Sequence, residues 1–254
     1  MSKALLIDTD LCLDCNACTV ECKRNNDVPV GQKIAWTKIA EFERGTYPKI
    51  SAYFIKHACN HCTNPSCMQA CPTGAISRPD GVHVVINQDW CIGCGYCVEA
   101  CPFGVPHFGD PKGSAQKCNF CYGRRADDEP TACAAACPFG AITFGERQEL
   151  IARGQARVEQ LRQQGKANAN LYGLTQMGGL NVLYVLADVP SAYGLPEDPK
   201  PFTRNLAAAW AGGVLAAGLL TLMPFYAVFR RRQEVGSAQE RQAGRDESSK
   251  DANE

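Results

Sequence analysis

The sixteen cysteines are the residues of this chain best suited to chemistry, and they occur as four groups of four. Thiolate sulfur is a soft ligand that suits zinc, copper(I) and iron–sulfur clusters. The first and third groups have the spacing C-x2-C-x2-C-x3-C, the second has C-x2-C-x4-C-x3-C, and the fourth is two pairs around a longer insert. In order, the groups are Cys12, Cys15, Cys18 and Cys22; Cys59, Cys62, Cys67 and Cys71; Cys91, Cys94, Cys97 and Cys101; and Cys118, Cys121, Cys133 and Cys137.

The spacing C-x2-C-x2-C-x3-C predicts the ligands of a [4Fe–4S] cluster. Three thiolates at positions i, i+3 and i+6 surround one cluster on a tight loop, and the fourth points away to bind the other cluster of a pair. Proline follows the fourth cysteine at Pro72, Pro102 and Pro138, where it fixes the backbone as the chain leaves the loop. Sixteen thiolates therefore predict four [4Fe–4S] clusters with no ligand missing.

Two other uses of cysteine fit this pattern less well than iron–sulfur clusters do. A disulfide framework would need a signal peptide and scattered spacing, and neither is present. Zinc sites usually join two separated C-x2-C pairs, whereas the first group packs four cysteines into eleven residues. Cys22 is followed by Lys23 instead of proline, and residues 63–66 lengthen the second group. These departures indicate an elaborated relative of a two-cluster ferredoxin.

The rest of the sequence gives little sign of an active site. The 26 basic and 26 acidic side chains leave no net charge, which argues against a protein that binds nucleic acid by neutralising phosphates. No glycine-rich dinucleotide turn, phosphate loop or Ser-His-Asp arrangement is legible. Four clusters without other catalytic groups predict a path for electrons.

Several charged or imidazole side chains lie close to the cysteines in sequence. His57 and His61 flank Cys59, and because the thiolates already suffice, we expect both to pack or hydrogen-bond around the ligands. Lys117 and the two arginines at 124–125 follow the third group. They either balance the negative charge of the clusters or form a solvated face.

Short strands are expected to frame the cysteine groups. Strands are predicted at Lys3–Asp8, at 51–56 with 34–39 as a partner, and at 82–86 in a hairpin with 75–77. The later groups end in a repeated Cys-Pro-x-Gly phrase, so the groups form an internal repeat of a ferredoxin half-unit. Because clusters would occupy the interior, we expect a thin core whose folding depends on metal assembly.

The sequence after Cys137 has a different character. Residues 146–164 predict a helix that stops at Gly165, with Leu150, Ile151, Val158 and Leu161 on one side and Gly154 in its middle. Residues 180–187 predict a strand. Residues 190–201 contain four prolines and predict an extended connector.

Residues 206–229 are 24 consecutive residues without a charge. As a helix they would extend ~36 Å, enough to cross a bilayer core of ~30 Å. Gly212, Gly213 and Gly218 would let a neighbouring helix approach closely. A buried helix of a soluble protein is the alternative. The polar residues 233–254 predict a disordered tail.

These elements predict an α+β chain of two ferredoxin-like dicluster units, a pseudo-repeat, followed by a single transmembrane helix. We expect a four-cluster domain at 1–145, an extension and connector at 146–201, a membrane anchor at 202–232 and a polar tail at 233–254.

The arginines at 230–232 place the tail in the cytoplasm by the positive-inside tendency, although Lys200 and Arg204 oppose this. The cluster domain would then face the periplasm from a single-pass anchor in the inner membrane. The N-terminus has no apolar signal segment and no twin arginine. We therefore expect export in a folded state with a partner that carries the signal.

The chain resembles the iron–sulfur beta subunits of membrane-bound respiratory formate dehydrogenases. The four cysteine groups, the stretch 178–186 (GGLNVLYVL) and the stretch 193–199 (YGLPEDP) before the apolar segment carry the resemblance, which covers roughly residues 3 to 230. The cysteine motifs are shared with many four-cluster subunits of molybdenum enzymes and hydrogenases, and the two later stretches are more specific.

The resemblance implies that the cysteine groups share ligands between clusters. One cluster would take Cys12, Cys15, Cys18 and Cys137, a second Cys22, Cys118, Cys121 and Cys133, a third Cys59, Cys62, Cys67 and Cys101, and a fourth Cys71, Cys91, Cys94 and Cys97. Some relatives replace a cysteine of the third group and hold a three-iron cluster. Cys94 is present in this chain, so four complete clusters are expected.

The function implied is that of a non-catalytic electron-transfer subunit in anaerobic respiration. It would carry electrons from a molybdenum- or tungsten-containing catalytic subunit that oxidises formate to a cytochrome b membrane subunit that reduces quinone. The alternative in the same class is the equivalent electron-transfer subunit of a [NiFe] hydrogenase or of another molybdoenzyme. A different class of function is a membrane-tethered redox sensor or structural metal protein.

Overall fold

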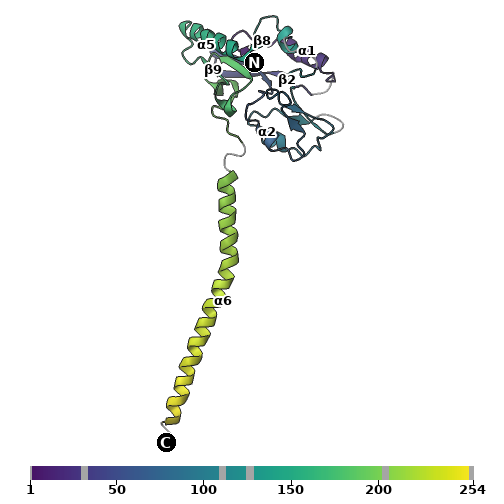
Figure 1. Cartoon of the computed structure of the whole chain (residues 1–254). Helices are drawn as coiled ribbons and strands as arrows, with labels where there is room; N and C mark the ends of the chain where they lie inside the picture. Colours follow the sequence, from purple (N-terminus) through teal and green to yellow (C-terminus); the bar gives the residue numbers. More distant parts are fainter. Residues whose placement is uncertain (1, 30–33, 109–112, 124–128, 202–205, 252–254) are drawn as a thin grey trace. The chain divides into compact units, whose positions relative to one another are not determined.

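The computed structural model describes residues 2–29, 34–108, 113–123, 129–201 and 206–251 (Figure 1). The chain forms two compact units, Met1–Thr203 and Arg204–Glu254. The first unit contains all sixteen cysteines in a mixed α/β fold, and the second contains one long helix. Each unit is described by itself below.

A four-stranded sheet joins the beginning and the end of the first unit. Its strands are β1 (Lys3–Asp8), β8 (Ile142–Glu146), β9 (Asn170–Tyr172) and β10 (Val182–Leu186), in the order β8-β1-β10-β9. β1 pairs antiparallel with β8 and parallel with β10. The strand predicted at Lys3–Asp8 is confirmed, and the one predicted at 180–187 is β10. Because the sheet spans the predicted boundary at residue 145, both segments belong to one unit.

Helix α5 (Arg147–Gln163) packs on one face of this sheet. Leu150, Val158 and Leu161 are buried there, as the helical periodicity predicts. A Cβ atom at Gly154 would lie 2.8 Å from a terminal carbon of Leu171. Gly154 is therefore needed for the close approach of α5 to the sheet, and it does not interrupt the helix.

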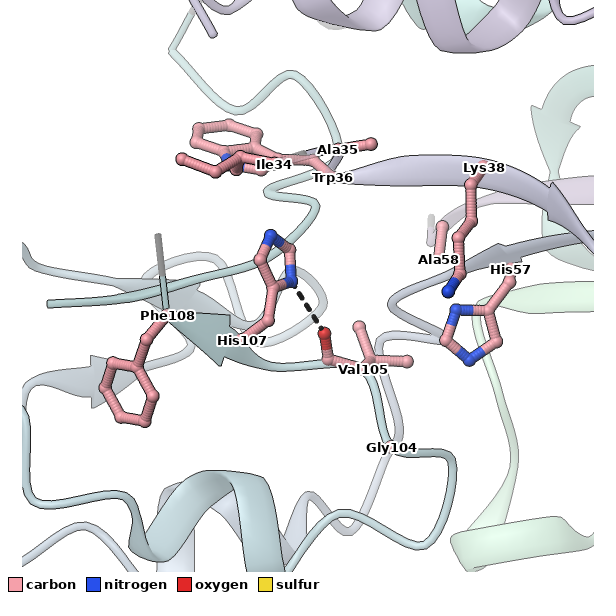
Figure 2. Close-up of a pocket in the computed structure, with 10 residues that line it drawn as sticks. All are labelled: Ile34, Ala35, Trp36, Lys38, His57, Ala58, Gly104, Val105, His107 and Phe108. Carbon is pink, nitrogen blue, oxygen red and sulfur yellow. Dashed lines mark hydrogen bonds between the residues drawn. The ribbon is translucent and has the colours of Figure 1, made fainter. Parts of the chain in front are cut away.

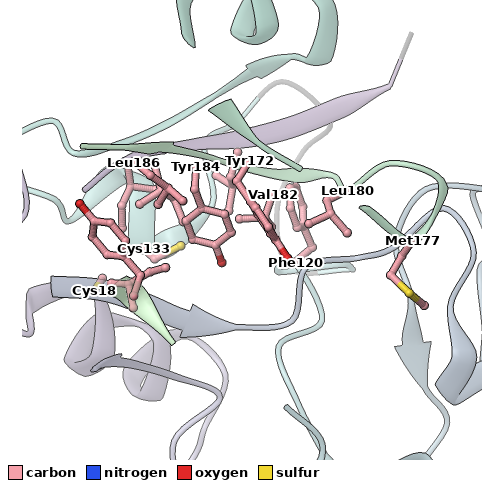
Figure 3. Packing of buried hydrophobic residues seen from close by; sticks show 14 of the residues in the cluster. Cys18, Phe120, Cys133, Tyr172, Met177, Leu180, Val182, Tyr184 and Leu186 are labelled. Carbon is pink, nitrogen blue, oxygen red and sulfur yellow. The ribbon is translucent and has the colours of Figure 1, made fainter. Parts of the chain in front are cut away.

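The other face of the sheet contributes to the largest buried cluster of the unit (Figure 3). Every residue of β10 is buried, with Tyr184 and Leu186 facing the cysteines and Leu183 facing α5. Cys18 and Cys133 belong to the same cluster as Tyr184. The predicted thin core is therefore wrong for this region, since a strand buried on both faces gives the cysteine loops a substantial apolar foundation.

A long hairpin, β2 (Thr37–Thr46) and β3 (Lys49–Ala58), also packs against this cluster. The predicted pairing of 34–39 with 51–56 is confirmed. The first strand, however, begins three residues later than predicted and extends to Thr46. Two short hairpins follow: β4 (Ile76–Ser77) with β5 (Val85–Ile86), which confirms the predicted hairpin in shorter form, and β6 (His107–Phe108) with β7 (Ala115–Gln116).

The extended connector predicted from 190 is wrong at its start. Residues Pro190–Tyr193 form a 3-10 turn, η2, in which Ala192 and Tyr193 are buried. The Tyr193 ring meets the Tyr53 ring edge-on at 5.1 Å, and the Tyr193 hydroxyl accepts a hydrogen bond from the backbone N–H of Ala187. An aromatic side chain in a proline-rich segment can thus anchor the segment to the core. A second 3-10 turn, η1, spans Gln176–Gly178.

The second unit is the helix α6 (Leu206–Asp251). Its segment Trp210–Ser237 is long and apolar enough to cross a membrane, with a mean hydropathy of 1.8 in its most apolar window. Residues 202–205 of the predicted anchor lie outside the described residues. The polar tail is helical as far as Asp251, so the predicted disorder is wrong there. No proline after Pro224 interrupts the helix, and an ion pair of 3.2 Å joins Arg230 to Glu234 one turn later.

Candidate iron–sulfur cluster sites

The four cysteine groups have the same local construction. All sixteen thiols are free. The third cysteine of each group is the second residue of a helix: α1 (Ala17–Asn25), α2 (Ser66–Gln69), α3 (Tyr96–Glu99) or α4 (Ala132–Ala135). These four cysteines are at most 8% exposed: Cys18, Cys67, Cys97 and Cys133. Each loop therefore turns its third thiol into the interior through the start of a helix.

A residue with positive φ lies two positions after the first cysteine of every group. These residues are Asp14, His61, Gly93 and Phe120, with φ of 49°, 45°, 70° and 63°. Successive N–H groups beside a left-handed residue turn toward one side and form a concavity that attracts negative charge. The loops are thus shaped to surround an anionic group, although a histidine or phenylalanine in this conformation could not be predicted from residue type.

The Cys-Pro-x-Gly phrases form three equivalent turns. Gly74, Gly104 and Gly140 have φ of 68°, 60° and 63°, and each N–H donates to the carbonyl of the cysteine three residues earlier. At Cys71, burial acts to raise the thiol pKa, but the Thr73 hydroxyl and the N–H groups of the turn outweigh it, and the pKa is lowered. The turn therefore favours the thiolate that a cluster requires.

The first group lacks this turn because Lys23 follows its fourth cysteine. Helix α1 continues to Asn25 instead, whereas the other three cysteine helices have four residues each. Amide groups replace the missing N–H donors: Asn26 Nδ2 lies 3.7 Å from Cys22 Sγ, and Asn25 Nδ2 lies 3.6 Å from Cys121 Sγ.

Two cavities are each lined by four cysteines from two different groups. The first is lined by Cys12, Cys15, Cys18 and Cys137. The second is lined by Cys71, Cys91, Cys94 and Cys97. These are the first and fourth ligand sets implied by the resemblance, so the structure brings those thiols together around spaces with the donor chemistry of an iron–sulfur cluster.

The members of the second and third ligand sets are also neighbours. Burial raises the pKa of Cys22, and the three nearby thiols that raise it further are Cys118, Cys133 and Cys121. Burial likewise raises the pKa of Cys62, and here the contributing thiols are Cys59, Cys101 and Cys67. Members of the second and third sets are thus close to one another.

The four sets follow one another in a series. A thiol of each later set raises the pKa of a thiol in the set before it, in addition to the larger effect of burial. The pairs are Cys133 with Cys18, Cys59 with Cys118, and Cys97 with Cys67. Neighbouring thiols therefore connect the first set with the second, the second with the third, and the third with the fourth.

The two ends of the series are open to the surface. Cys15 in the first set and Cys94 in the fourth are the two exposed cysteines, while the other fourteen are half-buried or buried. Exposed apolar side chains adjoin both ends, with Leu13 61% exposed beside Cys15 and Ile92 68% exposed beside Cys94. The middle of the series is thus enclosed, and its ends are accessible.

No three His, Cys, Asp or Glu side chains converge on a point that would hold a single metal ion, within the part of the chain that the structure describes. Ligands of a [4Fe–4S] cluster are not expected to converge in this way, because each thiolate binds a different iron atom at the edge of a larger body.

Two buried lysines lie among the cysteines. Burial acts to lower the pKa of Lys56, but the negative charges of Cys133 and Cys118 outweigh it and raise that pKa above its usual value. The Lys117 ammonium donates to the carbonyl oxygens of Val84 and Cys118. The solvated face considered for Lys117 is therefore wrong. The arginines at 124–125 lie outside the described residues.

His61 and His57 each make a hydrogen bond to the backbone through one ring nitrogen. His61 is fully buried, which lowers its pKa well below the usual value, and its Nδ1 accepts from the N–H of Val84 at 3.0 Å. His57 Nε2 lies 2.9 Å from the carbonyl oxygen of Phe103. Both side chains pack around the cysteine loops, as predicted.

A wider hollow beside β2 and β3 contains no cysteine (Figure 2). His57, His107 and Lys38 line it together with the apolar Val105 and Phe108. His107 turns its Nδ1 toward the carbonyl oxygen of Val105, 3.1 Å away. This hollow is therefore separate from the ligand sets.

Comparison with known proteins identifies the family. The model of the family described as a 4Fe-4S dicluster domain matches residues 50–147. The formate dehydrogenase iron–sulfur subunit of Haemophilus influenzae is 36% identical over 242 residues, covering 84% of this sequence and 78% of that protein. This protein belongs to the formate dehydrogenase iron–sulfur subunits. As a member of this family, the subunit has an electron-transfer role and carries iron–sulfur clusters.

Two further formate dehydrogenase subunits and one subunit of a different enzyme are also similar to this subunit. The nitrate-inducible formate dehydrogenase iron–sulfur subunit of Escherichia coli is 35% identical over 238 residues, which cover 85% of this sequence and 80% of that protein. The formate dehydrogenase-O iron–sulfur subunit of Escherichia coli is 37% identical over 215 residues, which cover 78% of this sequence and 72% of that protein. A probable anaerobic dimethyl sulfoxide reductase subunit of the same organism is 36% identical over 135 residues, or 50% of this sequence.

The stretch 178–186 has a structural role in the subunit. The Asn181 side-chain amide donates to the carbonyl oxygens of His61 and Val82, at 2.9 and 3.3 Å, and Leu180 forms a β-bridge with Cys62. The stretch therefore supports the loop of the second cysteine group. Sequence reasoning missed Lys56 as a site residue, because nothing in a strand pattern shows that a lysine points inward.

Proposed function

We propose that the subunit carries electrons from a molybdenum- or tungsten-containing subunit that oxidises formate to a cytochrome b membrane subunit that reduces quinone. The observation that supports this most directly is the serial order of four cysteine sets with an exposed cysteine at each end. When bound, four [4Fe–4S] clusters would supply one-electron redox chemistry at successive points. The protein holds the ligands, excludes water from the middle sets and leaves both ends accessible.

The ligand sets proposed for the four clusters are those implied by the family resemblance. Groups one and four of the cysteines exchange ligands to make the first and second sets, and groups two and three do the same for the third and fourth. Two dicluster units in a pseudo-repeat would result. The two four-cysteine cavities and the equivalent positive-φ positions in all four groups support this arrangement.

The ends of the series would meet different partners. By family analogy, the sets from groups one and four face the catalytic subunit and the other sets face the membrane subunit. The exposed Leu13 beside Cys15 and Ile92 beside Cys94 support docking at both ends, because an apolar rim loses water on contact and brings a partner's redox centre close.

The helix α6 would anchor the subunit in the inner membrane and pack against the cytochrome subunit. The arginines at 230–232 follow the apolar segment and favour a cytoplasmic C-terminus with the cysteine unit in the periplasm. Digestion of the cysteine unit by protease added to intact spheroplasts tests this orientation, and protection from the protease would place the unit in the cytoplasm.

Purification of the native complex through a tag on this subunit tests the proposed function. We expect co-purification of a molybdenum- or tungsten-containing subunit, about sixteen iron atoms per copy of this subunit from four clusters, and reduction of those clusters on addition of formate. A nickel-containing partner would assign the subunit to a hydrogenase instead. Clearly fewer than four clusters, or zinc in their place, would contradict the electron path and favour a sensor or structural metal protein.

A further inference from the structure

Lys56 is a lysine whose whole side chain lies inside the protein. It is on β3, opposite Ile39 of β2, and it is 2% exposed. Lysine is almost never fully buried unless its charge has a partner. Its burial in a strand that starts at the surface therefore needs a specific explanation.

The surroundings of Lys56 are cysteines of two ligand sets. It lines the cavity of the first set together with Cys12 and Cys18. Cys133, Cys118 and Cys22 of the second set also lie near it. Lys56 therefore lies where the first and second sets meet.

No carboxylate provides the opposite charge within the part of the chain that the structure describes. The ion pairs there include none with Lys56. An ammonium buried without a counter-charge destabilises a fold strongly. A [4Fe–4S] cluster with four thiolates carries a net negative charge, so two clusters on either side of Lys56 would provide the missing counter-charge.

The backbone at Lys56 is held in place independently of these charges. The Tyr184 hydroxyl donates to the carbonyl oxygen of Lys56 at 3.2 Å and to Asn60 Oδ1 at 2.8 Å. Tyr184 is itself buried in β10, so the strand of the central sheet fixes the position from which the lysine extends. A neutral side chain of similar length at position 56 would keep this backbone contact.

We propose that Lys56 tunes reduction potentials: its buried positive charge makes the clusters of the first and second ligand sets easier to reduce. The proposal rests on the proposed function, since it requires clusters in those sets. Each cluster becomes more negative by one charge when it takes up an electron, and no proton needs to move. A fixed positive charge between two clusters stabilises the reduced form of both more than the oxidised form, because its attraction acts in a poorly screened interior.

The test compares the native complex with complexes that carry Lys56→Met or Lys49→Met. Lys49 is an exposed lysine at the start of the same strand, so its removal changes the net charge equally. Redox titration followed by EPR gives the potential of each cluster. We expect Lys56→Met to lower the equilibrium constant for reduction at least tenfold for two of the four clusters, which is a shift of about 59 mV, and Lys49→Met to leave all four unchanged.

Four outcomes would overturn the role of Lys56. Unchanged cluster potentials in a fully loaded Lys56→Met complex would show that the side chain serves packing only. Equal shifts of all four cluster potentials would lead to the same conclusion. So would a shift of the potentials with Lys49→Met. If Lys56→Met fails to retain iron, Lys56→Arg decides: restored iron content with arginine supports the charge role, and loss with both substitutions rejects it. Fewer than four clusters in the unaltered complex would instead reject the proposed function, which keeps the two failures distinct.

Discussion

The Asn181 side-chain amide donates a hydrogen bond of 2.9 Å to the carbonyl oxygen of His61, across 120 positions of the sequence. This bond joins the residue that precedes β10 of the central sheet to the loop of the second cysteine group. His61 has a positive φ, so its carbonyl is held in an orientation that a relaxed loop would not keep.

We expect Asn181→Leu to destabilise the holoprotein by about 1–3 kcal/mol, because it leaves a buried carbonyl without its donor. The free energy of unfolding in urea and the iron content measure this effect, and the loss of iron should begin with one cluster. Asn168→Leu is the matched control, since Asn168 donates to Asp188 at an exposed position. An equal loss in both variants would mean that the effect is not specific to the cysteine loop.

The two exposed cysteines offer a test of the direction of electron flow. In Cys15→Ser, damage to the first cluster should block entry, so formate should leave the remaining clusters oxidised. In Cys94→Ser, damage to the fourth should leave reduction by formate intact and stop quinone reduction. EPR after addition of formate and a quinone-reduction assay distinguish the two variants. The reverse pattern would mean that the catalytic subunit docks at the Cys94 end.

Gly154 lies where α5 and the sheet are too close together to accommodate a side chain. A side chain there would overlap Leu171 and approach Leu6, for which a Cβ would lie at 2.8 and 3.1 Å. Gly154→Val should therefore lower the free energy of unfolding by about 1–3 kcal/mol, as overpacking of a core does. Gly145→Ala, whose Cβ would lie 3.7 Å from Leu150, should have a much smaller effect. Thermal unfolding of both variants provides the comparison.

Removal of iron should affect the cysteine loops and the sheet with α5 differently. The buried cluster between α5 and the sheet contains no cysteine, whereas the other clusters do. After chelation of the iron, we expect amide hydrogens of the cysteine loops to exchange rapidly, while Leu183 and Val185 of β10 stay protected longest. Uniform loss of protection would show that the clusters are needed for the whole unit.

Truncation after Thr203 should separate the two units. Because Met1–Thr203 forms a compact unit of its own, we expect the shortened protein to retain its iron and to appear in the soluble fraction. The full-length protein should require detergent, since Trp210–Ser237 is apolar and exposed. Retention of the truncated form in washed membranes would indicate that the first unit binds a membrane partner strongly by itself.

The sequence indicates candidate ligands directly, but it does not indicate what surrounds them. Cysteine spacing is a direct chemical signal, and the strand Lys3–Asp8 and the helix near 147–163 follow from periodicity. The positive φ of Phe120 and the inward direction of Lys56 have no such signal, because both depend on contacts with distant segments. The prediction for Tyr193 is wrong for the same reason: local proline content indicates an extended segment, and packing against Tyr53 decides otherwise.

The pairing of β1 has a consequence for the order in which the protein is made. Its two partners, β8 and β10, both lie beyond the last cysteine in the sequence. On the ribosome, the first strand must therefore wait until residues 142–186 have emerged before the sheet can form. The cysteines of the first group therefore remain without the support of this sheet for most of synthesis.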